Sequence, residues 1–253
     1  MNTLLSRTST AAQAVDVLAE VALRHRAVRH PYLSAIANGS LPDPSWVLAD
    51  FARQYQDYSV HFPRYLLVLL SRLENPSHRE ALLSNLIEES GQYGDDELAA
   101  LAAHGVKADW ILGVPHPELF RRFRFALTDD DNGAEEIEVQ CWRDMLLSVL
   151  TMGSPAEAVG ALGLGTELIV STIYQPFVRA ITRHQDLNPR DTVFFQLHTL
   201  VDDSHQATLR QIAIDLAISE NSSADLSRGM HKALILRDSI WSWLHERALR
   251  CNS

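Results

Sequence analysis

Hydrophobic residues recur with a period of about 3.6 through most of this chain, and that pattern limits the folds it can form. The 11 Gly and 10 Pro residues cluster between the periodic stretches, where one helix ends and the next begins. No segment longer than four residues alternates as a half-buried strand does. The sequence therefore predicts an all-α protein.

Ordinary capping signals set the expected helix ends. Pro31 stops the first helix, Asn38-Gly39 ends the second, and Ser77-His78-Arg79-Glu80 has the pattern of a capping box. We expect helices over about residues 11–30, 31–38, 45–73, 77–91, 95–104, 117–127, 135–150, 155–184, 189–219 and 226–250. No repeat divides the chain, and the loops at 129–133 and 219–223 are too short for linkers, so we expect one domain over residues 1–253.

Composition excludes two classes of partner. The chain has 22 Lys and Arg against 32 Asp and Glu, a formal net charge of −10, so it offers no positive surface for nucleic acid or an anionic membrane. It has no run of about 18 apolar residues and no signal-peptide pattern, which favours a cytoplasmic protein. Cys141 and Cys251 suit packed free thiols better than a disulfide framework or a zinc site.

The predicted helix at 189–219 carries the most informative residues. On a helical wheel, His198, Asp202 and His205 fall inside the apolar arc of this helix or at its edge. A buried carboxylate without a partner would protonate, so the group needs a cation or a dense hydrogen-bond network. The His-x3-Asp-x2-His spacing can present three metal ligands from one helix, although satisfied polar residues at a helix contact would show the same pattern.

Two glutamates on other helices meet the same test. Glu167 lies in the apolar stripe of the helix predicted at 155–184. On the helix predicted at 77–91, Glu89 lies on the side of Leu82 and Leu86, whereas Glu88 points about 100° away. We therefore expect Glu89 to face the interior and Glu88 to be solvated.

Polar aromatic side chains also approach an inward face, on the helix predicted at 45–73. Tyr58 and His61 could contact a substrate there, but ordinary core aromatics with a satisfied histidine are the simpler interpretation. We assign neither residue a catalytic role from the sequence.

Several segments together resemble a known family. They are Gly163-Leu-Gly-Thr-Glu167, Ile173-Tyr174-x-Pro176, and Phe194-Phe-x-Leu-His198-x3-Asp202-x2-His205, with weaker support from Asn85-Leu-x-x-Glu89 and His30-Pro-Tyr-Leu. The chain from about His30 to Leu209 resembles the haem-oxygenase-like di-iron oxidases and oxygenases, whose superfamily includes pyrroloquinoline-quinone synthase and thiaminase II. The resemblance implies a bundle of about seven or eight helices around two iron ions held by three carboxylates and three histidines.

The same resemblance implies a set of metal ligands. Glu89 and Glu167 match the bridging carboxylates, and His198, Asp202 and His205 match the ligands of the late helix.

The sixth ligand departs from the common pattern. Relatives have a histidine three to about ten residues after the first glutamate, but Gln92, Asp95 and Asp96 occupy that window here. We favour His116, which begins a helix after a longer excursion of the chain, with His104 as the alternative.

The resemblance implies an enzyme that uses O2 and two Fe(II) ions, or manganese, to oxidise a small substrate. The ligand types agree, because carboxylate and imidazole ligands in a helical bundle suit these metals better than zinc. The resemblance implies an amino acid, amine or fatty-acid-like substrate, N-oxygenation, desaturation or C–C cleavage in specialised metabolism, and a homodimer. One alternative is a metal-free enzyme of the same fold, although neither cysteine lies in a matching motif. The other is a non-catalytic helical binding protein.

Overall fold

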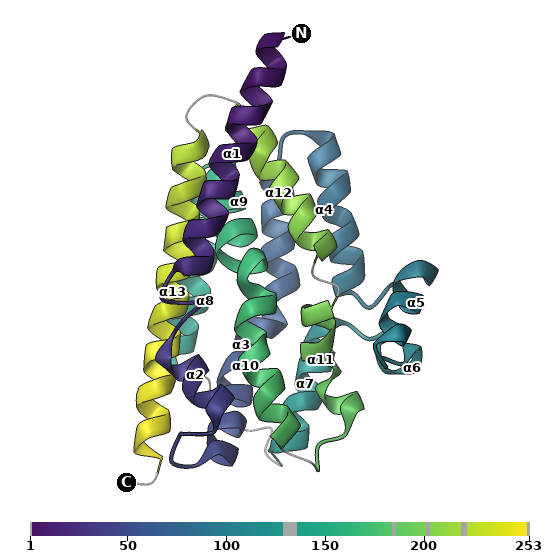
Figure 1. Cartoon of the computed structure of the whole chain (residues 1–253), viewed down its shortest axis with the longest axis vertical. Coiled ribbons are helices and arrows are strands. Elements are labelled where there is room, and N and C mark those ends of the chain that lie inside the picture. Colours follow the sequence, from purple (N-terminus) through teal and green to yellow (C-terminus); the bar gives the residue numbers. More distant parts are fainter. Residues whose placement is uncertain (1, 129–135, 184–185, 201–202, 219–221, 252–253) are drawn as a thin grey trace.

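The computed structural model describes residues 2–128, 136–183, 186–200, 203–218 and 222–251. All regular secondary structure in these ranges is helical, as Figure 1 shows, and the all-α prediction is confirmed. The helices surround one continuous hydrophobic core that draws on both the early and the late parts of the chain.

The helices are more finely divided than the seven or eight expected. In chain order they are α1 (Asn2–Arg24), α2 (Pro31–Asn38), α3 (Pro44–Arg72), α4 (Pro76–Glu89), α5 (Asp95–Ala103), α6 (Ala108–Ile111), α7 (His116–Leu127), α8 (Ile137–Met152), α9 (Pro155–Val159), the π-helix η1 (Gly160–Glu167), α10 (Leu168–Arg183), α11 (Pro189–Leu200), α12 (Asp203–Ile218) and α13 (Ser222–Arg250). Helices α9, η1 and α10 follow one another without a break, so they fill the stretch predicted as one helix.

Three local expectations differ from the structure. The first helix begins near residue 2 rather than 11, and the short helix α6 was not expected. Asn75, and not Ser77, caps α4, because the Asn75 side chain accepts a hydrogen bond from the Ser77 amide. The single helix expected at 189–219 is described as α11 and α12, with residues 201–202 outside the described part of the chain.

Helix α3 packs against α4, α7 and α8, while α10 packs against α2 and α11. Helix α13 covers α9, η1 and α8, and α1 lies along α12 and α13 (Figure 1). The short helices α5 and α6 project to one side of the bundle. This arrangement places the end of α4, the start of α7, the end of η1 and the end of α11 around one interior point.

Glycine allows α13 to approach α9 and η1 closely. A Cβ atom on Gly229 would overlap the Glu157 carbonyl, and one on Gly160 would overlap the Leu226 carbonyl.

The continuous stretch from Pro155 to Arg183 is long and apolar enough to span a membrane, but 83% of its most apolar window is buried in the bundle. Its composition is therefore explained by its place in the core.

Candidate metal centre

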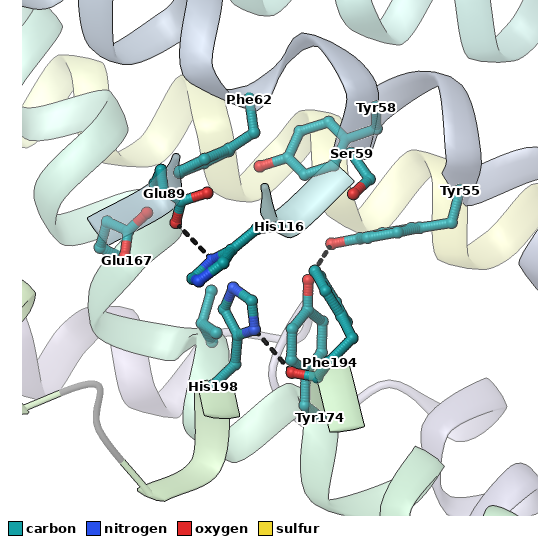
Figure 2. Close-up of a pocket in the computed structure, with 11 residues that line it drawn as sticks. Tyr55, Tyr58, Ser59, Phe62, Glu89, His116, Glu167, Tyr174, Phe194 and His198 are labelled. Carbon is teal, nitrogen blue, oxygen red and sulfur yellow. Dashed lines mark hydrogen bonds and ion pairs between the residues drawn. The ribbon is translucent and has the colours of Figure 1, made fainter. Parts of the chain in front are cut away.

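Four segments that are far apart in the sequence converge on a small cavity. Glu89 ends α4, His116 begins α7, Glu167 ends η1, and His198 lies near the end of α11. The cavity has a volume of about 20 Å³ (Figure 2). Its lining consists of these four residues with Tyr55, Tyr58, Ser59, Phe62, Val170, Tyr174 and Phe194.

The segment between α4 and α7, which contains α5 and α6, begins and ends at nearly the same place and so brings Glu89 and His116 together. Gly91 has a positive φ of 82°, and a Cβ there would overlap the Val114 backbone. The Gly113 amide donates to the Gly91 carbonyl at 2.8 Å, so the chain leaves α4 and returns to α7 at nearly the same place. The excursion through α5 and α6 therefore changes the sequence distance between the two residues without separating them in space.

His116 faces Glu89 with one ring nitrogen and Tyr93 with the other. His116 Nδ1 lies 3.1 Å from Glu89 Oε1, but the two atoms do not have the geometry of a hydrogen bond. His116 Nε2 lies 2.7 Å from the Tyr93 hydroxyl. Burial acts to raise the pKa of Glu89, but the adjacent His116, with smaller contributions from His198 and His205, outweighs burial and lowers this pKa to about 2, so Glu89 is ionised.

His198 is held in one tautomer. Its Nδ1 lies 2.7 Å from the Phe194 carbonyl, which can only accept, so Nδ1 carries the hydrogen and Nε2 keeps its lone pair. Burial, with a contribution from His116, lowers the pKa of His198 to about 4, so the ring is neutral at pH 7.

Glu89, His116 and His198 form what we call the three-ligand cluster. One ligand atom from each lies within 4.8 Å of the other two. The close approach of His116 Nδ1 to an ionised carboxylate oxygen, without a hydrogen bond, suits two ligands that share one cation. A carboxylate and two imidazoles also form a donor set suited to iron, manganese or zinc. The residues present therefore fit a metal ion.

The other predicted ligands are placed differently. Glu167 is buried and lines the same cavity. Asp202 lies outside the described residues. His205 is buried but does not line the cavity, and its Nε2 instead lies 2.7 Å from Glu88 Oε2. Burial acts to lower the pKa of His205, but the Glu88 carboxylate raises it to about 9.

The expectation that Glu88 is solvated is wrong. The Glu88 side chain is only 13% exposed because His205 of α12 packs over it. Glu88, Glu97 and His205 line a separate surface pocket of about 430 Å³. The wheel gave the right direction for Glu89, but it could not include a neighbouring helix that covers Glu88.

The alternative ligand His104 is exposed at the end of α5 and does not line the cavity. His61 is also turned away from the cavity, with its Nε2 3.5 Å from Asp57 Oδ1, whereas Tyr58 lines the cavity. Both cysteines are free, but Cys141 is exposed rather than packed.

Sequence reasoning gave no role to four residues next to the site: Tyr55, Tyr93, Tyr174 and Arg237. Tyr93 lies in the excursion, where no helical period gives a direction. Arg237 carried a usable signal, because it is a charged residue on the apolar face of the last helix.

Comparison with known proteins agrees with this architecture. The family model described as "Iron-containing redox enzyme" matches residues 49–238, so the chain belongs to this haem-oxygenase-like family. A protein named 4-aminobenzoate synthase from Chlamydia pneumoniae is 23% identical over 221 residues, which cover 86% of this chain and 87% of the relative.

Solved structures show the same fold. A CADD-like protein of unknown function from Nostoc punctiforme has a TM-score of 0.74 at 14% identity, covering 97% of this chain and 98% of its own. A TenA homologue from P. horikoshii has a TM-score of 0.54 at 15% identity, covering 96% and 98%. The predicted haem-oxygenase-like bundle is therefore confirmed.

Proposed function

We propose that this protein is an O2-dependent oxidase or oxygenase that uses two Fe(II) ions, or manganese, to oxidise a small substrate. One observation carries the proposal: the three-ligand cluster faces a small interior cavity in a chain of an iron-containing redox family. A cluster of this kind, aimed at a cavity, is unusual for a scaffold protein, in which buried polar groups satisfy one another.

Glu89, His116 and His198 would hold metal in the cavity, and Glu167, Asp202 and His205 are the further ligands that we propose for a two-ion site. Bound iron would supply the redox chemistry with O2 that amino acid side chains cannot perform. His205 has to lose its proton and its bond to Glu88 before it can bind a metal.

The protein's own residues orient the ligands and keep the site dry. The Phe194 carbonyl fixes the tautomer of His198, and the Tyr93 hydroxyl fixes the ring of His116. The rings of Phe62 and Phe194 form apolar parts of the cavity wall, which limit the access of water.

The substrate class follows from relatives only as a proposal. We propose an amino acid, amine or fatty-acid-like substrate, and the relative named 4-aminobenzoate synthase adds this compound to the products to be sought. We further propose that the protein works in the cytoplasm and as a homodimer, with no nucleic acid partner.

Anaerobic reconstitution with ferrous salt tests the proposal. The expected result is close to two equivalents of iron per chain, followed by O2 consumption when air is admitted. The exposed His104→Ala variant is the matched control and should load normally. A protein that stays metal-free after reconstitution, or that binds iron but never consumes O2 with any substrate of these classes, would reject the proposal in favour of a metal-free enzyme or a binding protein.

A further inference from the structure

Arg237 of α13 is a buried cation with unusual partners. It is only 2% exposed, and its guanidinium donates to the hydroxyls of Tyr55 at 2.8 Å and Tyr58 at 2.9 Å. The rings of Trp142 and Trp241 lie within 5.2 Å and 5.7 Å of the guanidinium carbon. Within the described part of the chain, no carboxylate forms an ion pair with it. A desolvated charge of this kind is stabilised by a nearby anion.

Arg237 also fixes the direction of the hydrogen bonds around it. Arginine can only donate, so the oxygens of Tyr55 and Tyr58 accept from it. The hydroxyls of Tyr55 and Tyr174 lie 3.1 Å apart, and one of them donates to the other. The three phenols carry three hydroxyl protons, and this contact uses one. The other two protons have no acceptor among the described residues.

All three tyrosines line the cavity that contains the three-ligand cluster. Figure 2 shows Tyr55 and Tyr174 meeting on one side of the cavity, with Tyr58 directed into it from α3. We call Tyr55, Tyr58 and Tyr174 the tyrosine wall. Two unused hydroxyl donors with a positive charge behind them are complementary to a group that only accepts hydrogen bonds and is negatively charged. A carboxylate has both properties and two oxygens to receive the two donors.

We propose that the tyrosine wall, with Arg237 behind it, is the binding subsite for the carboxylate group of a small substrate. The proposal rests on the proposed function in one respect, since it names the substrate class of the same cavity. The cavity of about 20 Å³ has room for little more than one water molecule, so the ligand must be small and the side chains of the wall have to move apart slightly to admit it. Arg237 acts through Tyr55 and Tyr58, and it is therefore a positioning residue.

The test measures carboxylate binding to the metal-free protein, so that iron cannot provide the binding site. An NMR titration with isotope-labelled acetate is compared with acetamide, which has nearly the same shape but no charge. Acetate is expected to bind, and acetamide at least about tenfold more weakly, because hydrogen bonds to a charged acceptor are the stronger ones. Chloride at equal ionic strength controls for general screening.

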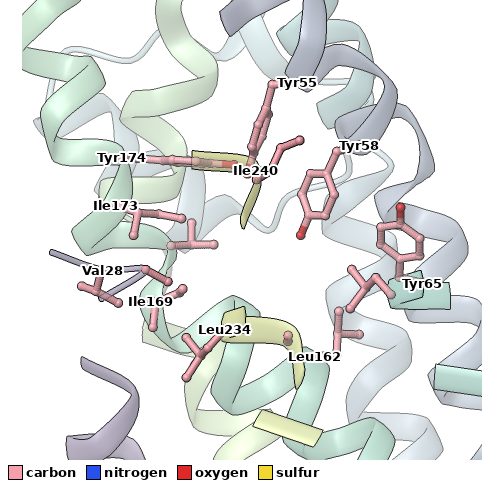
Figure 3. Close-up of a cluster of buried hydrophobic side chains, with 14 of the residues drawn as sticks. Val28, Tyr55, Tyr58, Tyr65, Leu162, Ile169, Ile173, Tyr174, Leu234 and Ile240 are labelled. Carbon is pink, nitrogen blue, oxygen red and sulfur yellow. Dashed lines mark hydrogen bonds between the residues drawn. The ribbon is translucent and has the colours of Figure 1, made fainter. Parts of the chain in front are cut away.

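Single phenol-to-phenyl variants locate the subsite. Tyr58→Phe and Tyr174→Phe each remove one hydroxyl of the tyrosine wall and should weaken acetate binding at least about tenfold. Tyr65→Phe is the matched control, because Tyr65 is buried on the same helix as Tyr58 and does not line the cavity. Its hydroxyl has no hydrogen-bond partner, so its loss should leave acetate binding unchanged. Figure 3 shows Tyr58 and Tyr65 next to each other with their hydroxyls directed differently.

Three results would overturn the subsite: equal binding of acetamide and acetate, equal affinities in the Tyr58→Phe and Tyr65→Phe variants, or acetate binding only after iron is added. Arg237→Met could fail to fold, so the proposal is tested on the tyrosine variants alone. Failure of the proposed function is a separate result. If the protein binds acetate at the tyrosine wall but takes up no iron, the subsite stands and the oxidase function is rejected. If it takes up iron but does not bind acetate, only the subsite is rejected.

Discussion

His198 and His205 lie seven residues apart in the chain, yet their surroundings favour different protonation states. Burial and the nearby His116 lower the pKa of His198 to about 4, so its ring is neutral. Burial acts in the same direction on His205, but the Glu88 carboxylate raises its pKa to about 9, so its ring is protonated. Because a metal needs an imidazole lone pair, His198 is ready to bind a metal and His205 is not.

The difference shows that burial alone does not determine whether a histidine can be a ligand. The hydrogen-bond partner of the ring determines this. His198 bonds to a backbone carbonyl, which is neutral. His205 bonds to a carboxylate, which stabilises the protonated ring. Metal binding by His205 therefore requires a rearrangement that metal binding by His198 does not.

The largest expected effect comes from removing His198, the histidine whose ring is already neutral. His198→Ala should lower iron affinity by more than about 100-fold, beyond what loss of an outer partner does. His205→Ala should leave about one iron per chain, because the three-ligand cluster is intact. Metal analysis after anaerobic reconstitution measures both. Full iron content in His198→Ala, or complete iron loss in His205→Ala, would show that the two histidines are not different in this way.

A smaller effect is expected when a neutral partner is removed. Tyr93→Phe deletes the hydroxyl that lies 2.7 Å from His116 Nε2 and should lower iron affinity about 10- to 100-fold. A competition titration with a chromophoric chelator measures this affinity. Tyr65→Phe, with its unpartnered hydroxyl away from the cavity, is the control. Equal affinities in the two variants would mean that Tyr93 does not support His116.

The sequence predicted the parts of this site that depend on one helix at a time. Hydrophobic periodicity placed Glu89 and Glu167 in the interior, and both are 3% exposed. The resemblance to a family suggested His116 despite the long excursion, and His116 lies against Glu89. Their roles as ligands remain predictions, but their positions follow from local pattern and from motif.

The parts that failed depend on contacts between helices. A wheel gives Glu88 a direction, but it cannot show that His205 of another helix covers it. Nor can a wheel show which partner each ring nitrogen receives, and this partner decides the charges of His198 and His205. The tyrosine wall likewise joins α3 and α10, and Arg237 behind it comes from α13, so no single segment contains this pattern.

The charged partner of His205 can be tested through stability. The wheel alone predicts that changing Glu88 does little, whereas the structure predicts that Glu88→Gln weakens a largely buried, charge-assisted hydrogen bond. We expect the free energy of unfolding to fall by about 1–3 kcal/mol at pH 6.5. Urea denaturation measures it, with Glu80→Gln at an exposed position of the same helix as control. Equal losses of unfolding free energy in the two variants would mean that changing Glu88 does as little as the wheel alone predicts.

The smallest expected effect is the pH dependence of that loss. An unfolded histidine has a pKa of about 6.5, and His205 in the folded protein has a pKa of about 9. Its protonation therefore stabilises the fold fully below pH 6.5, and this contribution disappears as the pH rises to 9. Subtracting the Glu88→Gln stability curve from that of the unchanged protein cancels every group that titrates alike in both. The difference should shrink toward zero between pH 6.5 and 9, while a constant difference would mean that Glu88 does not raise the pKa of His205.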